Sequence, residues 1–262
     1  MAADGDGTPA GRLWQRMEAA ERQARPSLDR GRVVAAAVRV ADADGLAAVT
    51  MRRVAAELGS SPMALYRHVD RKEDLPELML DAVLGEIELI DPTGDWRADL
   101  RLLNARRRAA LLAHTWLSGV FGAHPPVGPH AAAFLECELA CLAPLGAPPH
   151  VVRGIVGAVD VLVTGSVMRE LAEREVLRGA GITRAEAVRQ ARPYMDRIAG
   201  SGRYPHFSTI MLTDTDTDTG AGAAPGHSDE EEDAAFLGVL DCLLDGLELR
   251  LLGTTPQPPP AP

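Results

Sequence analysis

The chain has 262 residues, of which 46% are hydrophobic and only 4% aromatic, and its formal net charge is −10 at pH 7. This composition is sufficient for one or two globular domains with largely aliphatic cores. Three cysteines, Cys137, Cys141 and Cys242, have no spacing typical of a metal site or a disulfide framework. No signal peptide and no apolar run of about 18 residues is evident. We therefore expect a soluble, cytoplasmic protein with no metal, no other cofactor and no membrane partner.

The charge is unevenly distributed along the chain. Residues 11–72 contain 12 basic and 7 acidic residues, a net charge of +5. Residues 73–262 contain 15 basic and 28 acidic residues, a net charge of −13, and Asp4 and Asp6 account for the remainder. A basic N-terminal segment joined to an acidic body favours an approach to a polyanion through the basic part.

Residues 1–27 form a Gly-rich start followed by four arginines around Trp14. Two interpretations of this flexible basic N-terminal arm remain open. It either reaches into a DNA minor groove, as basic arms beside helical DNA-binding domains do, or it is a solvated tail without fixed structure.

A helix is predicted from Leu28 to Asp44, where Gly45 ends an apolar stripe with helical spacing. Thr50 is suited to cap a second helix, and Gly59 is suited to end it. Ser61 as N-cap and Pro62 as first helical residue begin a third helix directly afterwards. Two short helices joined by a tight Gly-containing turn indicate a helix-turn-helix, in which the second helix enters the DNA major groove.

The third helix carries Leu65-Tyr66-Arg67-His68-Val69, and Lys72 follows at the start of the next helix. Together with the Thr50 cap and the Gly59 turn, this order resembles the TetR family of bacterial repressors. The resemblance is specific over about residues 28–90, and beyond them it rests on the order and character of the helices. It implies an all-α fold, with a three-helix DNA-binding domain at residues 28–72 and a larger helical domain for ligand binding and dimerisation at residues 73–253.

The resemblance also implies roles in DNA binding. Phosphates or adjacent bases would be contacted by Thr50 and Arg52, and phosphates by Tyr66, His68 and Lys72. The groove edge would be met by Ser61, Met63 and Ala64. Arg67 replaces the uncharged residue that the family often has and would contact a guanine or a phosphate. Because Met63 and Ala64 offer no hydrogen-bonding side chain, specificity would depend on thymine methyl groups and DNA shape, which leaves the operator unpredicted.

The remaining chain alternates amphipathic segments with Pro- and Gly-containing breaks, and this pattern predicts further helices. Their expected ranges are 72–90, 95–114, 129–145, 149–179, 183–199 and 230–252. Thr183 and Glu186 have the spacing of a capping box at the start of the fifth of these helices. Helical periodicity is lost between the helix expected at 183–199 and the last helix, so residues 200–229 are expected to form a mobile loop. Residues 254–262 are expected to form a disordered tail.

Polar and aromatic residues gather near helix ends in the middle of the chain and suggest a ligand pocket. The candidates are Asn104, Arg108, His114, Trp116, Phe121, Phe134 and Cys137. Ordinary core packing, or a salt-bridged surface in the case of the arginines, explains the same residues, and Glu138 is expected to face solvent.

Two broad aliphatic stripes suggest a four-helix dimer interface, which is where the resembled family dimerises. The candidates are Val152, Ile155, Val159, Leu162, Leu240, Leu244 and Leu247. The alternative is that these side chains form the core of a monomer.

The sequence therefore predicts a homodimeric transcription regulator, a repressor that binds a palindromic operator in double-stranded DNA and is released by a small-molecule effector. A ligand-independent architectural DNA-binding protein is the alternative, and repression is not distinguished from activation. An enzyme is not expected, because the sequence contains no nucleophile–base pair, metal-ligand spacing or phosphate-binding loop.

Overall fold

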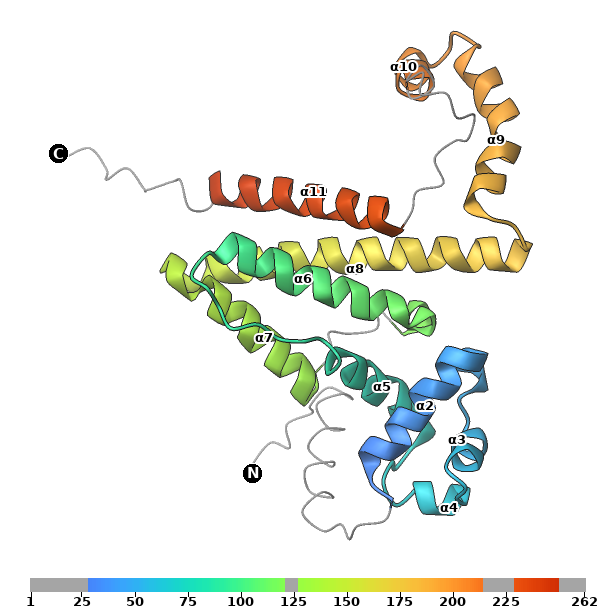
Figure 1. The fold of residues 1–262 in the computed structure, drawn as a ribbon, viewed down its shortest axis with the longest axis vertical. Coiled ribbons are helices and arrows are strands. Elements are labelled where there is room, and N and C mark those ends of the chain that lie inside the picture. The colour runs from blue at the N-terminus through green and yellow to red at the C-terminus, as the bar shows by residue number, and fades with distance from the viewer. Residues whose placement is uncertain (1–27, 121–126, 214–228, 250–262) are drawn as a thin grey trace, which may run out of the picture. The chain divides into compact units, whose positions relative to one another are not determined.

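The computed structural model describes residues 28–120, 127–213 and 229–249, in which every regular element is helical. The α-helices are α2 (Arg30–Asp44), α3 (Met51–Glu57), α4 (Pro62–Leu65), α5 (Leu75–Leu84), α6 (Trp96–Ala113), α7 (Pro129–Leu142), α8 (Pro149–Ala180), α9 (Arg184–Ala199), α10 (Pro205–Thr213) and α11 (Asp229–Leu247) (Figure 1). The short 3-10 helices are η1 (Leu46–Ala48), η2 (Lys72–Asp74), η3 (Thr115–Gly119) and η4 (Ala143–Leu145). The all-α prediction is confirmed. The predicted arm at residues 1–27, the tail at residues 254–262 and the candidate Phe121 lie outside the described residues.

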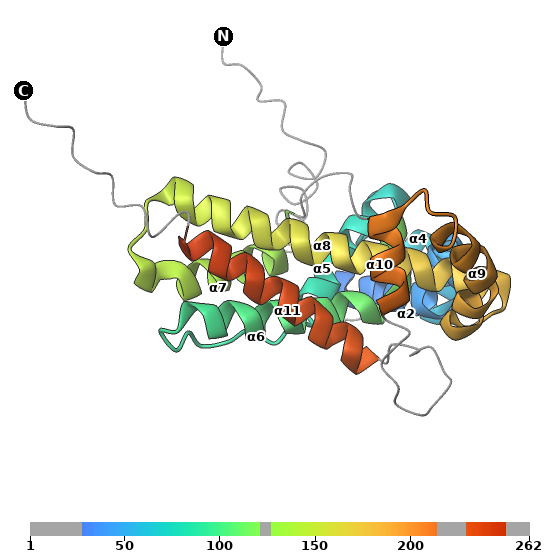
Figure 2. The same ribbon diagram turned by 90° about the horizontal axis from the view of Figure 1, so that it is seen from above.

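The chain divides into two compact units. The first comprises residues up to Met168 together with those from Leu237 onward, and the second runs from Arg169 to Phe236. Helices α8 and α11 each contribute to both units (Figure 2).

Helices α2, α3 and α4 pack together around an apolar core in the first unit. Asp29 caps α2 by accepting the Arg32 backbone N–H at 2.8 Å, and Gly45 ends this helix with a φ of +82°, which a glycine adopts without strain. Val33, Val54 and Leu65 are completely buried where the three helices meet. The predicted three-helix arrangement is therefore present.

The helix expected over residues 72–90 is shorter in the structure. Residues 72–74 form the 3-10 helix η2, and α5 spans only Leu75–Leu84. Pro76 lies in the first turn of α5, where its missing N–H is tolerated, so a continuous α-helix from Lys72 is disfavoured. The prediction was wrong at both ends, although Ile87 is buried as its spacing indicates.

Helix α5 also holds the start of α7, which has no side-chain cap of its own. The buried Asp81 carboxylate accepts the backbone N–H groups of His130 at 3.1 Å and Ala131 at 3.0 Å. Gly85 faces the His130 ring so closely that a Cβ at this position would lie 2.8 Å from Nδ1. Helices α5 and α7 are thus held together by the Asp81 cap and by the close contact between Gly85 and His130.

Helix α6 lies among α7, the first half of α8 and α11. Arg107 of α6 pairs with Asp160 of α8 at 2.6 Å. Arg97 binds Glu248 at 2.6 Å, and Arg101 binds Asp241 of α11 at 3.2 Å. The ion pairs lie around a core formed by fully buried aliphatic residues: Leu100, Leu103, Leu111, Ile155, Val159, Leu240 and Leu244.

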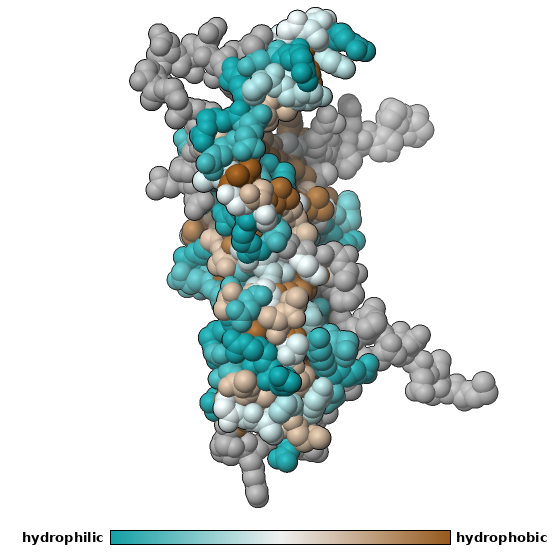
Figure 3. All heavy atoms as spheres, turned by 90° about the vertical axis from the view of Figure 1, so that its right-hand side faces the viewer, coloured by the Kyte–Doolittle hydropathy of each residue, from teal (hydrophilic) through white to brown (hydrophobic). Residues whose placement is uncertain are grey.

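By length and composition alone, α8 is apolar enough to cross a membrane, with a mean hydropathy of 1.7 over its most apolar window. Part of this composition belongs to the core of the first unit, where Ile155, Val159 and Val163 are completely buried. On the face drawn in Figure 3, hydrophobic residues form separate patches between hydrophilic ones. Within the single chain, 28% of the most apolar window of α8 is buried, so this helix combines a core face with an exposed apolar face.

In the second unit, α9 begins with the predicted capping box. The Thr183 hydroxyl accepts the Glu186 N–H at 3.2 Å, and the Glu186 carboxylate accepts the Thr183 N–H at 2.7 Å, which lowers the pKa of Glu186. The expected loop over residues 200–229 was wrong for its first part, because α10 occupies Pro205–Thr213 and packs against α9. The Ser208 hydroxyl fastens α10 by donating to the Ala199 carbonyl at 2.7 Å.

Candidate functional site

The two helices of the helix-turn-helix begin at the caps that the sequence indicates. The Thr50 hydroxyl accepts the Arg53 N–H at 3.1 Å, and the Ser61 hydroxyl accepts the Ala64 N–H at 3.3 Å. Gly59 has a φ of +60° in the turn between them. Helix α4 ends at Leu65, but backbone hydrogen bonds continue to Val69, so the following residues keep a helical course.

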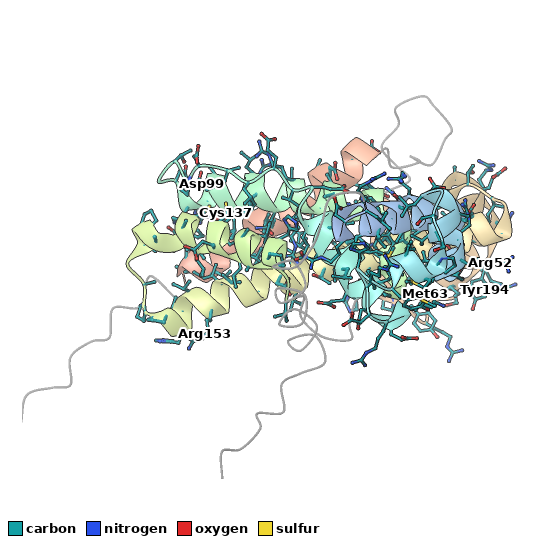
Figure 4. The ribbon with its side chains drawn as sticks, turned by 90° about the horizontal axis from the view of Figure 1, so that it is seen from below. Arg52, Met63, Asp99, Cys137, Arg153 and Tyr194 are labelled. Carbon is teal, nitrogen blue, oxygen red and sulfur yellow. The ribbon has the colours of Figure 1, made fainter. Side chains whose placement is uncertain are left out.

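The residues predicted to contact DNA share one property, which is that none is fully buried. Met63 is 73% exposed and Tyr66 44% exposed, whereas the intervening Leu65 is completely buried. Figure 4 shows Arg52 and Met63 on the helix-turn-helix. The exposed members are Arg52, Ser61, Met63, Tyr66, Arg67 and Lys72, and the half-buried ones are Thr50, Ala64 and His68.

Two neighbouring arginines on α3 have different roles. Arg53 pairs with Asp44 at 3.2 Å and with Glu57 at 3.3 Å, so it ties α3 to the end of α2. Arg52 is exposed and makes no ion pair with any described residue. The arrangement leaves the Arg52 guanidinium available to a phosphate or a base.

A second candidate site is a buried polar cluster in the helical body, formed by Asn104, Arg107, Glu138 and their neighbours. Asn104 of α6 donates from Nδ2 to Glu138 of α7 at 3.1 Å and to the Leu100 carbonyl at 3.1 Å. The Arg107 guanidinium lies 5.2 Å from the Phe134 ring centroid and binds Asp160. Helices α6, α7 and α8 therefore all contribute to one cluster.

The cluster is not fully satisfied by the described residues. Asn104 is completely buried, yet its Oδ1 accepts no hydrogen bond from them, and the buried Arg107 Nε donates none to them. Burial raises the pKa of Glu138, although the Asn104 hydrogen bond and the Arg107 charge oppose this effect. A buried acceptor and a buried donor without partners among the described residues make this cluster a candidate ligand site.

The structure disperses the predicted pocket residues. Asn104 and Phe134 belong to the polar cluster, and Arg108 is buried on the same helix. Cys137 donates from Sγ to the Ile90 carbonyl at 3.4 Å. His114 and Trp116 instead bind Asp42 of α2.

Sequence reasoning missed three important residues. Glu138 is 3% exposed, so the expectation that it faces solvent was wrong, and its burial follows from the Asn104 hydrogen bond. Arg107 was not selected from the run of three arginines at 106–108, although its position three residues after Asn104 places both on one helix face. Asp42 had no recognisable signal, because its partners lie more than 70 residues away.

Four residues predicted at the dimer interface are instead core residues of a single chain. Ile155, Val159, Leu240 and Leu244 are at most 1% exposed within the chain and are therefore not accessible to a partner. Val152, Leu162 and Leu247 are half-buried. The aliphatic stripes were correctly recognised as buried surface, but most of that surface is buried by neighbouring helices.

Two family descriptions match the chain. Residues 33–78 match "Bacterial regulatory proteins, tetR family", and residues 90–251 match "Tetracyclin repressor-like, C-terminal domain". The chain is 38% identical over 201 residues to the HTH-type transcriptional repressor DrrR1 of Streptomyces coeruleorubidus. The aligned residues cover 76% of this chain and 74% of DrrR1. This chain is 37% identical over 166 residues to an HTH-type transcriptional regulator of Saccharopolyspora erythraea, covering 63% and 70% of the two chains.

Solved structures share the same fold. ActR of Streptomyces coelicolor without ligand has a TM-score of 0.66 at 23% identity, covering 86% of this chain and 96% of ActR. ActR in complex with actinorhodin also has a TM-score of 0.66 at 23% identity, with coverages of 88% and 99%. A TetR variant from Acinetobacter baumannii in complex with minocycline has a TM-score of 0.57 at 24% identity, with coverages of 86% and 99%. Because both domains match TetR family descriptions and the helix-turn-helix is exposed, the chain belongs to the TetR family of DNA-binding transcription regulators. The names of its relatives indicate a regulatory role and not an enzymatic one.

Proposed function

We propose that this regulator is a homodimeric repressor that binds a palindromic operator and is released from it by a small molecule. The observation that carries the proposal is the presence, in one chain, of an exposed helix-turn-helix and a buried polar cluster in which two hydrogen-bonding atoms have no partner among the described residues. The repressor name of the relative DrrR1 and the bound ligands of ActR and TetR support the same role.

The DNA-reading surface would be the exposed side of α3, α4 and η2. Tyr66, His68 and Lys72 would hold phosphates, and Thr50 and Arg52 would contact a phosphate or an adjacent base. Ser61, Met63 and Ala64 would lie at the groove edge, with Arg67 on a guanine or a phosphate. In a dimer, the two reading helices would meet half-sites about one helical turn apart, roughly 34–36 Å, or a multiple of this distance.

The effector would bind at the polar cluster. The Asn104 Oδ1 requires a hydrogen-bond donor and the Arg107 Nε requires an acceptor. These residues are three positions apart on α6, so their side chains lie on one face at about 5–6 Å between Cβ atoms. A compound with a hydroxyl group close to a carbonyl oxygen would satisfy both atoms. Arg108, Phe134 and Cys137 stay proposed as neighbours of this site, whereas the contacts of His114 and Trp116 favour a different role.

The dimer would form through the surfaces of α8 and α11 that neighbouring helices leave exposed. Val161 of α8 is 73% exposed and Val239 of α11 is 54% exposed. Glycines flank both valines, and a Cβ added to Gly157, Gly165, Gly238 or Gly246 would meet no atom within 4 Å. Small residues allow helices of two chains to approach closely, so this face is suited to a four-helix interface.

The DNA-binding part is tested by fluorescence anisotropy on duplexes obtained by selection from randomised DNA. Wild type is expected to bind tightly, with affinity falling steeply as salt rises, and Tyr66→Ala to lose much of that affinity. Tyr194→Ala is the matched control, because Tyr194 is similarly exposed but lies on α9. Selected sites without two-fold symmetry would contradict the palindromic operator.

The dimer is tested by sedimentation of Val161→Glu, which is expected to be monomeric. Val176→Glu should remain dimeric, because Val176 is comparably exposed but lies outside the proposed interface in the second half of α8. A dimeric Val161→Glu would refute this interface.

The effector site is tested by thermal stability with 1-hydroxyanthraquinone and its methyl ether. The hydroxyl, which is internally hydrogen-bonded to the adjacent carbonyl in the free compound, can share its proton with Asn104 Oδ1 while that carbonyl also accepts from Arg107. The methyl ether has no proton to share, so only the first compound is expected to raise the Tm of wild type. Asn104→Leu should abolish this rise. Equal stabilisation by the methyl ether would contradict the proposed chemistry.

A further inference from the structure

The contact between the helix-turn-helix domain and the helical body contains a histidine between two carboxylates. His114 follows the last residue of α6, and its Nδ1 lies 2.7 Å from Asp42 Oδ1. Its Nε2 lies 3.1 Å from Glu86 Oε2, just beyond the end of α5. The Trp116 Nε1–H donates to the same Asp42 oxygen at 2.8 Å. We name His114, Trp116, Asp42 and Glu86 the His114 latch.

The latch joins α2 of the DNA-binding domain to α6 and η3 of the helical body. Asp42 lies in the last turn of α2, the first helix of the DNA-binding domain, whereas His114 and Trp116 flank the junction of α6 and η3. Helix α6 also carries Asn104 and Arg107 of the polar cluster. One helix therefore connects the proposed effector site directly to the contact that holds α2.

The chemistry of the latch depends on a proton. A neutral imidazole has one N–H, so it can donate to only one of two flanking carboxylates, whereas an imidazolium donates to both. Burial by itself would lower the pKa of His114, but the hydrogen bonds and charges of Asp42 and Glu86 outweigh it and raise the pKa above its ordinary value. These two carboxylates are the charged groups that face the ring, and Trp116 adds a neutral donor.

We propose that the His114 latch, when protonated, holds the helix-turn-helix in its operator-binding orientation, so that operator affinity falls as the latch loses its proton. The physical reason is that a dimer reads two half-sites only when both reading helices keep a fixed separation. A domain that moves freely about its contact must lose this freedom on binding, which weakens the complex. The requirement for a fixed separation of the two reading helices rests on the proposed homodimer.

The test is the operator affinity of the full-length protein between about pH 6 and about pH 9. Wild type is expected to lose about tenfold in affinity for each unit by which operator binding raises the pKa of His114. His114→Gln cannot take up the proton, so it is expected to bind weakly and to lose the part of the wild-type pH dependence that comes from the latch. His150→Gln is the matched control, because it removes an exposed histidine of α8 that belongs neither to the latch nor to the proposed DNA surface, and it should keep the wild-type pH dependence. A wild-type profile in His114→Gln, or tight binding by that variant, would overturn the proposal.

Glu86→Gln provides a second test that does not depend on the folding of the His114 variant. The Glu86 side chain is 53% exposed, so the replacement is tolerated, and loss of its charge lowers the pKa of His114. The midpoint of the affinity profile should move to lower pH. An unchanged midpoint would contradict the role of the latch.

Trp116 reports on the latch without any DNA. With Trp14→Phe and Trp96→Phe, it becomes the sole tryptophan of the chain. Its emission is expected to change at the pH at which operator affinity begins to fall, because its indole N–H shares the Asp42 oxygen with His114. Emission that does not change with pH would overturn the latch. If the protein binds DNA as a monomer, the proposed dimer is refuted. The pH titration of Trp116 emission uses no DNA, so it still shows whether the latch changes with protonation.

Discussion

The helix-turn-helix and the helical body place their polar groups in opposite ways. Among the described residues, the eight buried polar or charged side chains all lie between Asp81 and Glu170, and none lies in residues 28–72. The DNA-binding region has an apolar interior and displays its polar groups at the surface, as suits a polyanion. The body buries polar groups, which is unfavourable unless they are partnered. This difference indicates that each region is adapted to a different kind of partner.

The largest test of this contrast is Leu65→Ala, which removes a completely buried side chain from the apolar core of the helix-turn-helix. We expect a loss of about 2–5 kcal/mol in the stability of this region. Hydrogen exchange should show faster exchange in α2 and α3 than in α6 to α8. Met63→Ala, at a residue 73% exposed, should cost less than about 0.5 kcal/mol. An equal increase in exchange in both regions would mean that they unfold as one unit.

The interior of the body is tested by Asn104→Ala, which leaves Glu138 without its side-chain donor. We expect a loss of about 1–3 kcal/mol in the free energy of unfolding measured with urea. Asn104→Leu combined with Glu138→Leu should recover part of this loss, because both members of the hydrogen-bonded pair are then replaced and neither leaves the other without its partner. If the double variant is the less stable one, the cluster contributes more than mutual hydrogen bonding.

A smaller effect is expected at the surface of the DNA-binding region. Thr50→Ala removes the acceptor of the Arg53 N–H and should cost about 1 kcal/mol in thermal or urea unfolding. Thr50→Ser keeps the hydroxyl and should retain most of the stability. A full loss with serine would mean that the methyl group of Thr50, and not its hydrogen bond, stabilises α3.

The smallest expected effect is a pH dependence of stability at the boundary of the two regions. Because the folded-state pKa of His114 is raised, protonation stabilises the fold below the unfolded pKa, and this contribution is lost as pH rises through the folded pKa. The stability of wild type relative to His114→Gln should therefore decrease as pH rises from the ordinary histidine pKa of about 6.5 through the raised folded-state pKa. A constant difference would show that His114 contributes through packing alone.

The sequence predicted local features better than distant contacts. The Thr50, Ser61 and Thr183 caps were recognisable because each cap and its partner lie within three residues. The α10 helix was missed because it is short and precedes a low-complexity segment that obscures its periodicity.

Distant pairings had no comparable signal. Asn104 meets Glu138 across 34 residues, and His114 meets Asp42 across 72. An apolar stripe also does not reveal what covers it, so Ile155 and Leu240 were assigned to a dimer although their own chain buries them. Helix positions can thus be predicted from neighbours in sequence, whereas the buried site depends on how the helices are packed.

Because α5 caps α7, hydrogen exchange at the start of α7 should report on the tilt of α5. The amides of His130 and Ala131 are bonded to Asp81, so their hydrogen exchange depends on the position of another helix. Any tilt of α5 that withdraws the carboxylate should accelerate exchange at these two amides before the rest of α7 responds. Two neighbouring residues in the body would then record movements of the helix that leads to the DNA-reading surface.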